Sequence, residues 1–459
     1  MTITAEPGVR PARAARGRHW LRILWVPVLL VIASLAMGFT VTSSHGKALS
    51  PVDEWDYIDY LYKLPQEPVV PRGDIAGPET LSIISCDGFR IFGTMGAPCG
   101  TKPTDLSQYP QSAINTAAGY TPIFFWVTWA GAKAIQVVTH VDLVQAARYF
   151  GAFWLAGGVL MLWGLMRLFR VHPVAILAAG LALIASPYSW WTYTFVSTDA
   201  PSVLIGALTL FAAVKFARGQ WSGWWLVAIA FVGTLVKVTH LLGAALAVLY
   251  LVIEFVIRRV REKRRGFEWR RSIGRGSTDG LLVFGVLAGL AAAVAQFGWR
   301  FVLNLNVVGP DPDQGVHRPL TSTALQAEFT NFLPNTIVAN VSVGHILGLP
   351  VPGAIIAPLS WLTIAGVIGA FAIYRWRRPE SSIVYAVGIG AVCLAPVLAI
   401  VLALTGGYLQ LPSRYGGVLL PGMLLMLGLI AKNRIFVYGI LGYSVFLYGY
   451  MILHAPFYG

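Results

Sequence analysis

The chain has 459 residues, of which 56% are hydrophobic and only 12% are charged, about half the charged share of soluble domains. A soluble fold with so little charge could not cover its surface, and the mean hydropathy of +0.66 indicates a polytopic membrane protein. The same figures exclude a disordered chain, a coiled coil and a small disulfide scaffold. The net charge of +14 gathers in short clusters between apolar runs, which is typical of cytoplasmic loops and not of a nucleic-acid-binding surface.

The first segment, residues 1–22, is a basic tail that contains Arg10, Arg13, Arg16 and Arg18. The apolar run that follows, residues 23–42, is longer than the ~7–15-residue core of a cleaved signal peptide. We therefore expect a retained first span with the N-terminus in the cytoplasm.

Ten further apolar runs have the length of about 17–25 residues that a membrane-spanning helix needs. Together with the first run they predict an all-α protein with eleven transmembrane helices. These runs lie near residues 146–168, 172–188, 199–217, 222–237, 239–257, 279–303, 351–374, 382–404, 415–431 and 435–453.

One more aromatic-rich run, residues 121–139, begins near Pro122 and carries Lys133 in its interior. If this run does not cross, the cytoplasmic side holds 23 of the 34 Lys and Arg residues but only 6 of the 20 acidic residues. The inside then has a net charge of +17 and the outside of −3. Because short loops with so much positive charge resist export, we expect 121–139 to lie along the outer interface as an amphipathic helix. The C-terminus is then external.

This topology divides the chain into a small number of regions. After the tail and the first span come a first external loop with interfacial helices (43–145), a transmembrane bundle (146–303), a second external loop (304–350) and C-terminal transmembrane helices (351–459). Loops of this length usually have a function. The protein is expected in the plasma membrane, or the inner membrane where there are two, with its active site outside.

The three cysteines fit this arrangement. Cys86 and Cys99 lie in the first external loop, where an oxidising compartment favours a disulfide between them; the alternative is two free thiols. Cys393 lies inside a predicted span and is interpreted as a small apolar residue. The cysteines and the eight histidines show no metal-ligand spacing.

The segment SPVDEWDYIDYL, residues 50–61, follows the first span and predicts a short helix on the outer membrane surface. Ser50 would cap it, Pro51 would be its first residue and Asp53 its third. Asp53 and Asp56 would then share a face with Tyr57, turned toward water. By itself this pattern favours the simpler interpretation, in which Asp53 caps the helix and the other acids are solvated.

Three other polar groups lie at the predicted outer ends of spans: Asp199, the pair Lys237 and His240, and Arg414 with Tyr415. Asp199 could stabilise a helix start through the helix dipole. The cations suit a lipid-linked phosphate, which Arg binds bidentately, but they could also reach the lipid headgroups simply by snorkelling.

These groups together indicate a class of chemistry. No predicted span has an ionisable side chain near its middle, which argues against an ion-coupled transporter. The sequence has no P-loop and no dinucleotide motif, which argues against an ATP-driven machine. A carboxylate beside cations at a lipid boundary can accept the proton of a hydroxyl while the cations stabilise a departing phosphate.

The order of these motifs resembles the GT-C membrane glycosyltransferases, which use polyprenyl-phosphate-linked sugars, and among them the domain-of-unknown-function family 2142. The resemblance covers nearly the whole chain. It rests on VDEWDYIDYL, GYTPIFFWV, ARYFGAFWLAGGVLMLWGLMRLFRVHP, STDAPSVL, TLVKVTHLL and PSRYGGVLLPG, in this order.

The resemblance implies a GT-C fold in which Asp53 is the catalytic base, Glu54 assists it in the acceptor site, and Lys237 and Arg414 hold the donor phosphate. His240 is a further candidate for phosphate binding. The remaining site candidates are Asp56, Tyr57, Tyr120, Asp199 and Tyr415.

The chain departs from the family pattern at two places. Tyr57 stands where the family usually has His shortly after the acidic pair, and Tyr120 with Thr121 and Pro122 stands where it has His or Lys before two prolines.

The sequence thus predicts inverting transfer of a sugar from a polyprenyl phosphate to a cell-envelope glycan, lipid or protein, since a single displacement needs no covalent intermediate. No cofactor is required, although clustered carboxylates could hold a divalent cation. Two alternatives remain: a non-enzymatic carrier or flippase for lipid-linked glycans, and an assembly protein that has kept the fold without the chemistry.

Overall fold

The structure, a computed structural model, describes residues 13–264, 274–310, 319–339, 352–376, 378–405 and 408–454, with the backbone alone for 13–23 and 264. Parts of the predicted basic tail, the long basic loop, the second external loop and the C-terminal region therefore lie outside the described residues. Within the described ranges the chain is all-helical, and its β-type contacts are isolated bridges.

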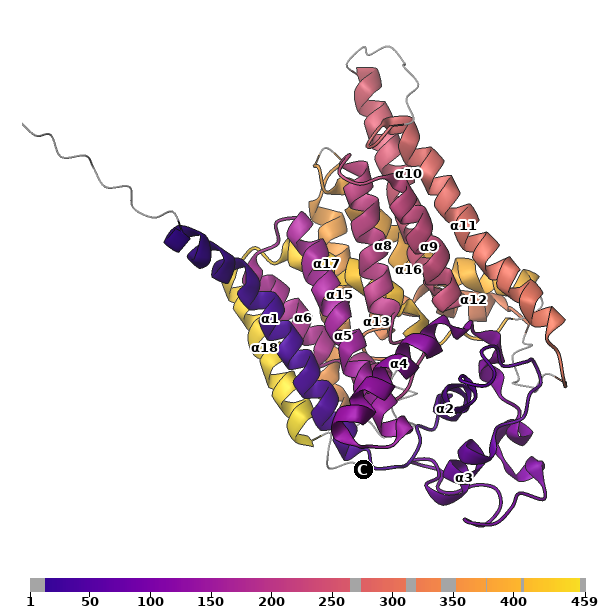
Figure 1. Ribbon diagram of the computed structural model, residues 1–459. Coiled ribbons are helices and arrows are strands. Elements are labelled where there is room, and N and C mark those ends of the chain that lie inside the picture. The colour runs from indigo at the N-terminus through magenta and orange to yellow at the C-terminus, as the bar shows by residue number, and fades with distance from the viewer. Residues whose placement is uncertain are drawn as a thin grey trace, which may run out of the picture.

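Long apolar helices form one bundle (Figure 1). Polar caps define several of their starts: Asp142 Oδ1 accepts a hydrogen bond from Gln145 N at 2.8 Å, and Ser277 Oγ accepts one from Gly280 N at 3.2 Å. The bundle consists of α1 (Arg13–Ser44), α5 (Leu143–Leu168), α6 (Pro173–Ile184), α7 (Pro187–Thr194), α8 (Ser202–Ala217), α9 (Gly223–Val236), α10 (Leu241–Arg264), α11 (Thr278–Leu305), α15 (Gly353–Ile373), α16 (Ser381–Leu404), α17 (Leu420–Ile430) and α18 (Arg434–His454).

Eight of the described helices are long and apolar enough to cross a membrane. The pair α6–α7, bent by 61°, makes a ninth if its two parts form one span. Helices α8 and α9 are apolar but shorter, with 16 and 14 residues. The architecture agrees with the predicted class of an all-helical, multi-pass membrane protein. A count of eleven spans additionally requires α8 and α9 to cross.

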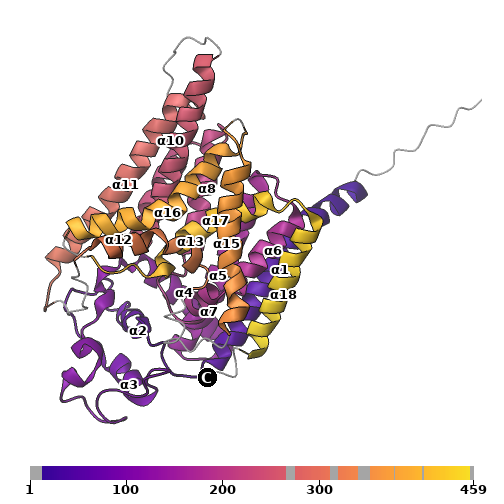
Figure 2. The same ribbon diagram turned by 180° about the vertical axis from the view of Figure 1, so that it is seen from behind.

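The described basic clusters lie together at one end of this bundle. Arg218 Nη1 donates to Leu168 O at 2.7 Å, which joins the ends of α8 and α5. Arg258 on α10 donates to Ala217 O at 2.7 Å, and Arg261 donates to Trp376 O at 3.3 Å beyond the end of α15. Both views show α10 and α11 rising at this end and the α2–α3 segment at the other (Figures 1 and 2).

The opposite end is covered by the two segments predicted to be external loops. The first segment contains α2 (Glu54–Lys63), α3 (Pro78–Cys86), three short 3-10 turns and α4 (Pro122–Thr139); the second contains α12 (Ser322–Phe329) and α13 (Phe332–Asn335). A disulfide joins Cys86 to Cys99, as expected. The predicted interfacial run is α4, which is not among the helices that could span a membrane. It packs on α5, with Trp154 Nε1 donating to Thr128 Oγ1 at 3.4 Å.

The helix expected on the outer membrane surface is different from the prediction in two respects. It begins at Glu54, so the capping arrangement around Ser50 and Pro51 is wrong. Its acids are also not turned toward water, because all residues from Glu54 to Leu61 are buried. Asp59 explains how a carboxylate is accommodated there: Gly77 N and Asn115 Nδ2 each donate to it at 2.6 Å.

Candidate functional site

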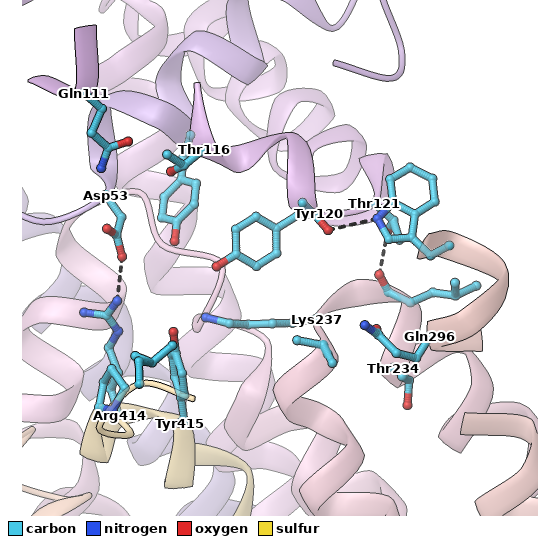
Figure 3. Close-up of a pocket in the computed structure, with 17 residues that line it drawn as sticks. Asp53, Gln111, Thr116, Tyr120, Thr121, Thr234, Lys237, Gln296, Arg414 and Tyr415 are labelled. Carbon is cyan, nitrogen blue, oxygen red and sulfur yellow. Dashed lines mark hydrogen bonds and ion pairs between the residues drawn. The ribbon is translucent and has the colours of Figure 1, made fainter. Parts of the chain in front are cut away.

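A cavity of about 450 Å³ lies at the loop-covered end of the bundle (Figure 3). It is bordered by the residue before α2, the turn before α4, the 3-10 turn η4 (Val238–His240) and the 3-10 helix η5 (Ser413–Leu419). Six of the residues predicted for the site line this cavity: Asp53, Tyr57, Tyr120, Lys237, Arg414 and Tyr415. Other lining residues were not singled out from the sequence, among them Gln111, Thr116, Gln296 and Trp299.

Asp53 is the carboxylate that reaches the cavity. Its backbone is left-handed, with φ of 59°, and its side chain makes no capping hydrogen bond to α2. The side chain is 36% exposed and accepts a hydrogen bond of 2.5 Å from Arg414 Nη2. A non-glycine residue in this conformation is uncommon and costs about 1–3 kcal/mol, which indicates that the carboxylate is held toward the cavity instead of toward the helix.

Arg414 and Lys237 are joined behind the cavity wall by Asp199. Lys237 Nζ lies 2.6 Å from Asp199 Oδ1, and Arg414 Nε lies 3.3 Å from Asp199 Oδ2 without hydrogen-bond geometry. The Lys237 side chain is only 1% exposed, as is that of Asp199, so snorkelling of Lys237 toward lipid headgroups is excluded in this conformation. Asp199 itself does not line the cavity and instead positions the two cations that do.

Aromatic rings surround these charges. The Arg414 guanidinium carbon lies 4.7 Å from the ring centre of Trp191, and Lys237 Nζ lies 5.1 Å from that of Tyr415 and 5.6 Å from that of Tyr120. Burial raises the pKa of Tyr120 and that of Tyr57, so both phenols stay protonated and can donate hydrogen bonds to an anion or a sugar.

The second loop segment fixes the chain that carries Arg414. Glu328 on α12 is 1% exposed, and its Oε1 accepts a hydrogen bond of 2.9 Å from Leu411 N. Thr336 Oγ1, following α13, donates to Ser413 O at 3.1 Å. The sequence analysis missed Glu328, which precedes the arginine by more than 80 residues and belongs to no motif.

Glu54 makes buried contacts that stabilise the fold. Its two carboxylate oxygens accept hydrogen bonds of 2.8 Å from Arg148 Nε and Nη2, and they also accept from Ser50 N at 2.7 Å and from Val196 N at 2.9 Å. The ion pair is fully buried and Glu54 does not line the cavity. The structure therefore places Glu54 outside the acceptor site expected for it. It holds the start of α2 on α5, beside Asp53.

Two more predicted site residues lie outside the cavity. His240 Nδ1 is 2.9 Å from Gly233 O and Nε2 is 3.0 Å from Ser202 Oγ, so both ring nitrogens are used within the bundle. Asp56 is 1% exposed and accepts a hydrogen bond of 2.7 Å from the backbone N of Thr116, which lines the cavity. Its second oxygen, Oδ2, is buried without a hydrogen-bond partner among the described residues.

The lining residues do not fit a divalent cation. Within the described ranges, no three His, Cys, Asp or Glu side chains come together in a way that could hold a metal. Among the described residues that line the cavity, Asp53 is the one carboxylate, and its neighbours there are cations. Glu54 and Asp56 are buried outside the cavity, so the carboxylates that the sequence suggested as a cluster do not come together to hold a metal.

The site thus combines one partly exposed carboxylate, two cations and a ring of aromatic side chains at one end of a helical bundle. Eight of the bundle's described helices are long and apolar enough to cross a membrane. This arrangement defines a multi-pass membrane protein with a polar, cationic site at a helix–loop boundary. No protein-family model matches the chain, and no curated protein sequence matches it either.

Proposed function

We propose that this protein is a membrane glycosyltransferase that moves a sugar from a polyprenyl-phosphate donor to a cell-envelope acceptor at the external face. The observation that carries the proposal is the chain of contacts from Asp53 through Arg414 and Asp199 to Lys237. These contacts hold one carboxylate and two cations on the wall of one cavity, the groups that the proposed reaction needs.

The proposed reaction is a single displacement. Asp53 accepts the proton of the acceptor hydroxyl, and the hydroxyl oxygen forms a bond to the anomeric carbon of the sugar. The bond from that carbon to the phosphate oxygen breaks, and its electron pair stays on the polyprenyl phosphate. Arg414 and Lys237 stabilise the charge that develops on this leaving group. Attack from the side opposite to the phosphate inverts the anomeric centre.

The Asp53–Arg414 pair suggests the order in which the two substrates bind. Arg414 Nη2 donates to Asp53 Oδ2 at 2.5 Å, so the carboxylate and a donor phosphate compete for the same guanidinium. A phosphate bound bidentately by Arg414 releases Asp53 toward the acceptor hydroxyl. The donor therefore binds first and frees the base that the acceptor needs.

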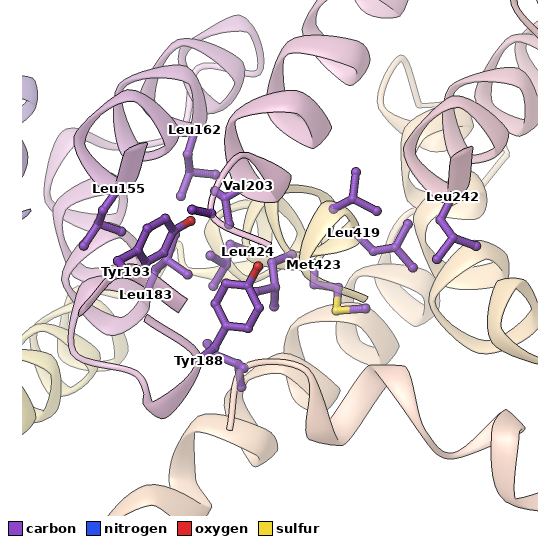
Figure 4. Close-up of a cluster of buried hydrophobic side chains, with 14 of the residues drawn as sticks. Leu155, Leu162, Leu183, Tyr188, Tyr193, Val203, Leu242, Leu419, Met423 and Leu424 are labelled. Carbon is purple, nitrogen blue, oxygen red and sulfur yellow. The ribbon is translucent and has the colours of Figure 1, made fainter. Parts of the chain in front are cut away.

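The packing beneath the site favours transfer at one face over passage of a lipid-linked glycan across the bundle. Tyr188 and Tyr193 of α7, Leu155 of α5 and Met423 of α17 are buried in one hydrophobic cluster within the bundle (Figure 4). A carrier or flippase would have to separate these packed helices to move a polar headgroup through them.

The test is Asp53→Asn, assayed with a synthetic polyprenyl-phosphate sugar and envelope acceptor while product is identified by mass spectrometry. Asn adopts left-handed backbone as readily as Asp, so the melting temperature stays within a few degrees. Donor binding is kept or becomes tighter, because the neutral amide competes less with the phosphate for Arg414. Transfer is lost, because an amide does not accept the proton. Asp105→Asn, in the same external segment but outside the cavity, is the matched control and keeps full activity.

Transfer at the wild-type rate by Asp53→Asn would exclude Asp53 as the base. Normal donor binding by the wild-type protein without transfer to any envelope fraction would favour the carrier instead.

A further inference from the structure

A second cavity, of about 700 Å³, lies at the opposite, basic end of the bundle. It is formed where α5 ends, where α6 and α18 begin, and where α17 ends. Three cations, Arg170, Lys432 and Arg434, line it together with His172 and one carboxylate, Glu380. The reaction proposed above uses none of these residues.

The charges of this cavity are not neutralised by neighbouring side chains. Across the residues that the structure describes, no ion pair reaches Arg170, Lys432 or Arg434. The Lys432 ammonium lies 5.3 Å from the ring centre of Tyr374, which orients it without cancelling its charge. Three cations facing one carboxylate leave the cavity with a positive potential suited to an anion.

The backbone around Arg170 supports a role for its side chain. Val171 N donates to Met166 O at 3.2 Å, so Arg170 occupies the position after α5 where such a helix end usually has glycine. Its φ is 55°, in the left-handed region. A long cation is kept at a position that favours glycine, and it faces the cavity. The N-terminal ends of α6 and α18, which carry partial positive charge, also face it.

The surroundings indicate that the anion belongs to a lipid. Next to Arg434, the surface of α18 is apolar and open: Ile435 is 83% exposed and Tyr438 is 59% exposed. Val174 and Val437 extend the apolar lining into the cavity itself. A ligand with a charged head and hydrocarbon chains can place its head among the cations and its chains along α18, whereas a soluble anion would use only the head contacts.

We propose that this cavity binds the phosphate headgroup of an anionic phospholipid from the membrane leaflet at the basic end of the bundle. The proposal is independent of glycosyl transfer, because it concerns other residues at the other end of the protein. Basic cavities between helices at this membrane face are suited to acidic headgroups.

The test is a titration of the full-length protein in neutral detergent, followed by native mass spectrometry. Dioleoylphosphatidylglycerol is the anionic probe, and dioleoylphosphatidylcholine, which is zwitterionic and has no net charge, is the comparison. We expect the wild type to bind the anionic lipid at least about 10-fold more tightly. The double variant Arg170→Gln/Arg434→Gln lowers this affinity about 30-fold, and Glu380→Gln raises it about 5-fold by removing the opposing charge.

The matched control is Arg167→Gln/Arg375→Gln, which removes the same charge from exposed side chains at the same end but outside the cavity lining. Its affinity stays within about 3-fold of wild type. Equal losses in both double variants would overturn the proposal, since net charge alone would explain them. Displacement of the lipid by an equal concentration of inorganic phosphate would also overturn it and assign the cavity to a soluble anion. If the cavity variant does not fold, Glu380→Gln decides alone, because tighter binding supports the proposal and unchanged binding contradicts it.

Discussion

Arg414 donates a 2.5 Å hydrogen bond from Nη2 to Asp53 Oδ2, although 361 residues separate the two in the chain. The contact joins the segment between α1 and α2 to η5, which precedes α17. An early and a late part of the chain therefore meet at the cavity. Because Arg414 also faces Asp199, a change at any of these three residues alters the charge seen by the other two.

Replacing Arg414 by Lys keeps the charge but removes the planar fork of the guanidinium. We expect the Michaelis constant for the donor to rise about 10- to 150-fold, corresponding to loss of a charge-assisted hydrogen bond of roughly 1.5–3 kcal/mol. Transfer rates measured against donor concentration provide the value. The control is Arg300→Lys, an exposed cation on α11 that does not line the cavity. Unchanged kinetics in Arg414→Lys would remove this residue from the donor site.

Gly206 on α8 tests whether the position of η5 controls the donor site. A Cβ at Gly206 would lie 2.0 Å from Val418 O, so Gly206→Ala must displace the segment that carries Arg414. We expect a loss of stability of about 1–3 kcal/mol and weaker donor binding. Gly289→Ala on α11, where a Cβ meets nothing within 4 Å, should instead be neutral or slightly stabilising. Thermal unfolding and donor titration measure both effects; similar behaviour of the two variants would contradict this reasoning.

Glu54→Gln distinguishes a structural carboxylate from a catalytic one. Loss of its charge leaves Arg148 buried without a counter-ion, which costs about 3–5 kcal/mol of folding free energy. The melting temperature should fall sharply, and the double variant Glu54→Gln/Arg148→Met should recover part of it. Glu67→Gln, an exposed carboxylate in the same segment, serves as control. If the Glu54→Gln variant melted normally but did not transfer sugar, Glu54 would have a role in the acceptor site and not a structural one.

Asp56 makes the stability of the outer segment depend on pH. Burial raises its pKa well above the ordinary value of 3.8, although the hydrogen bond from Thr116 N opposes this shift. With a folded pKa above the unfolded one, the stability that Asp56 contributes is complete below about pH 4 and decreases as the pH rises through the folded pKa. Asp56→Asn should remove this slope of at most about 1.4 kcal/mol per pH unit and raise the melting temperature at neutral pH. If the melting temperatures of the variant and the wild type changed equally between pH 4.5 and 8.5, Asp56 would not be the source of the pH dependence.

The helical class was predictable because it depends on local properties of the sequence. Runs of apolar residues interrupted by basic clusters predicted the bundle helices except α7, which lies between two predicted runs, and the clusters that the structure describes do lie at one end. The pairing of Cys86 with Cys99 followed from their common segment. Six cavity-lining residues were also recognised, from the polar motifs at the predicted outer ends of the apolar runs and from the order of these motifs.

What the sequence could not give depends on contacts between distant segments. The periodicity of residues 50–61 predicts an exposed acidic face, but the segments around Gly77 and Asn115 fold over that face and donate hydrogen bonds to it. Glu54 looked equivalent to Asp53 until its partner Arg148 was known, and Arg148 lies in an ordinary apolar helix. Glu328 holds the arginine segment through hydrogen bonds from Leu411 N and Tyr408 OH, contacts between distant parts of the chain that leave no pattern in the sequence.

The ion pair between Lys237 and Asp199 bears on how the protein is made. Asp199 precedes α8 and Lys237 follows α9, so the pair closes the open end of an antiparallel hairpin. With 16 and 14 residues, the two helices are each shorter than the ~20 residues that a lone span needs. Delivered to the membrane as one unit, they carry a carboxylate and an ammonium that neutralise each other. We therefore expect α8 and α9 to enter the membrane together as a hairpin, after Lys237 has been synthesised.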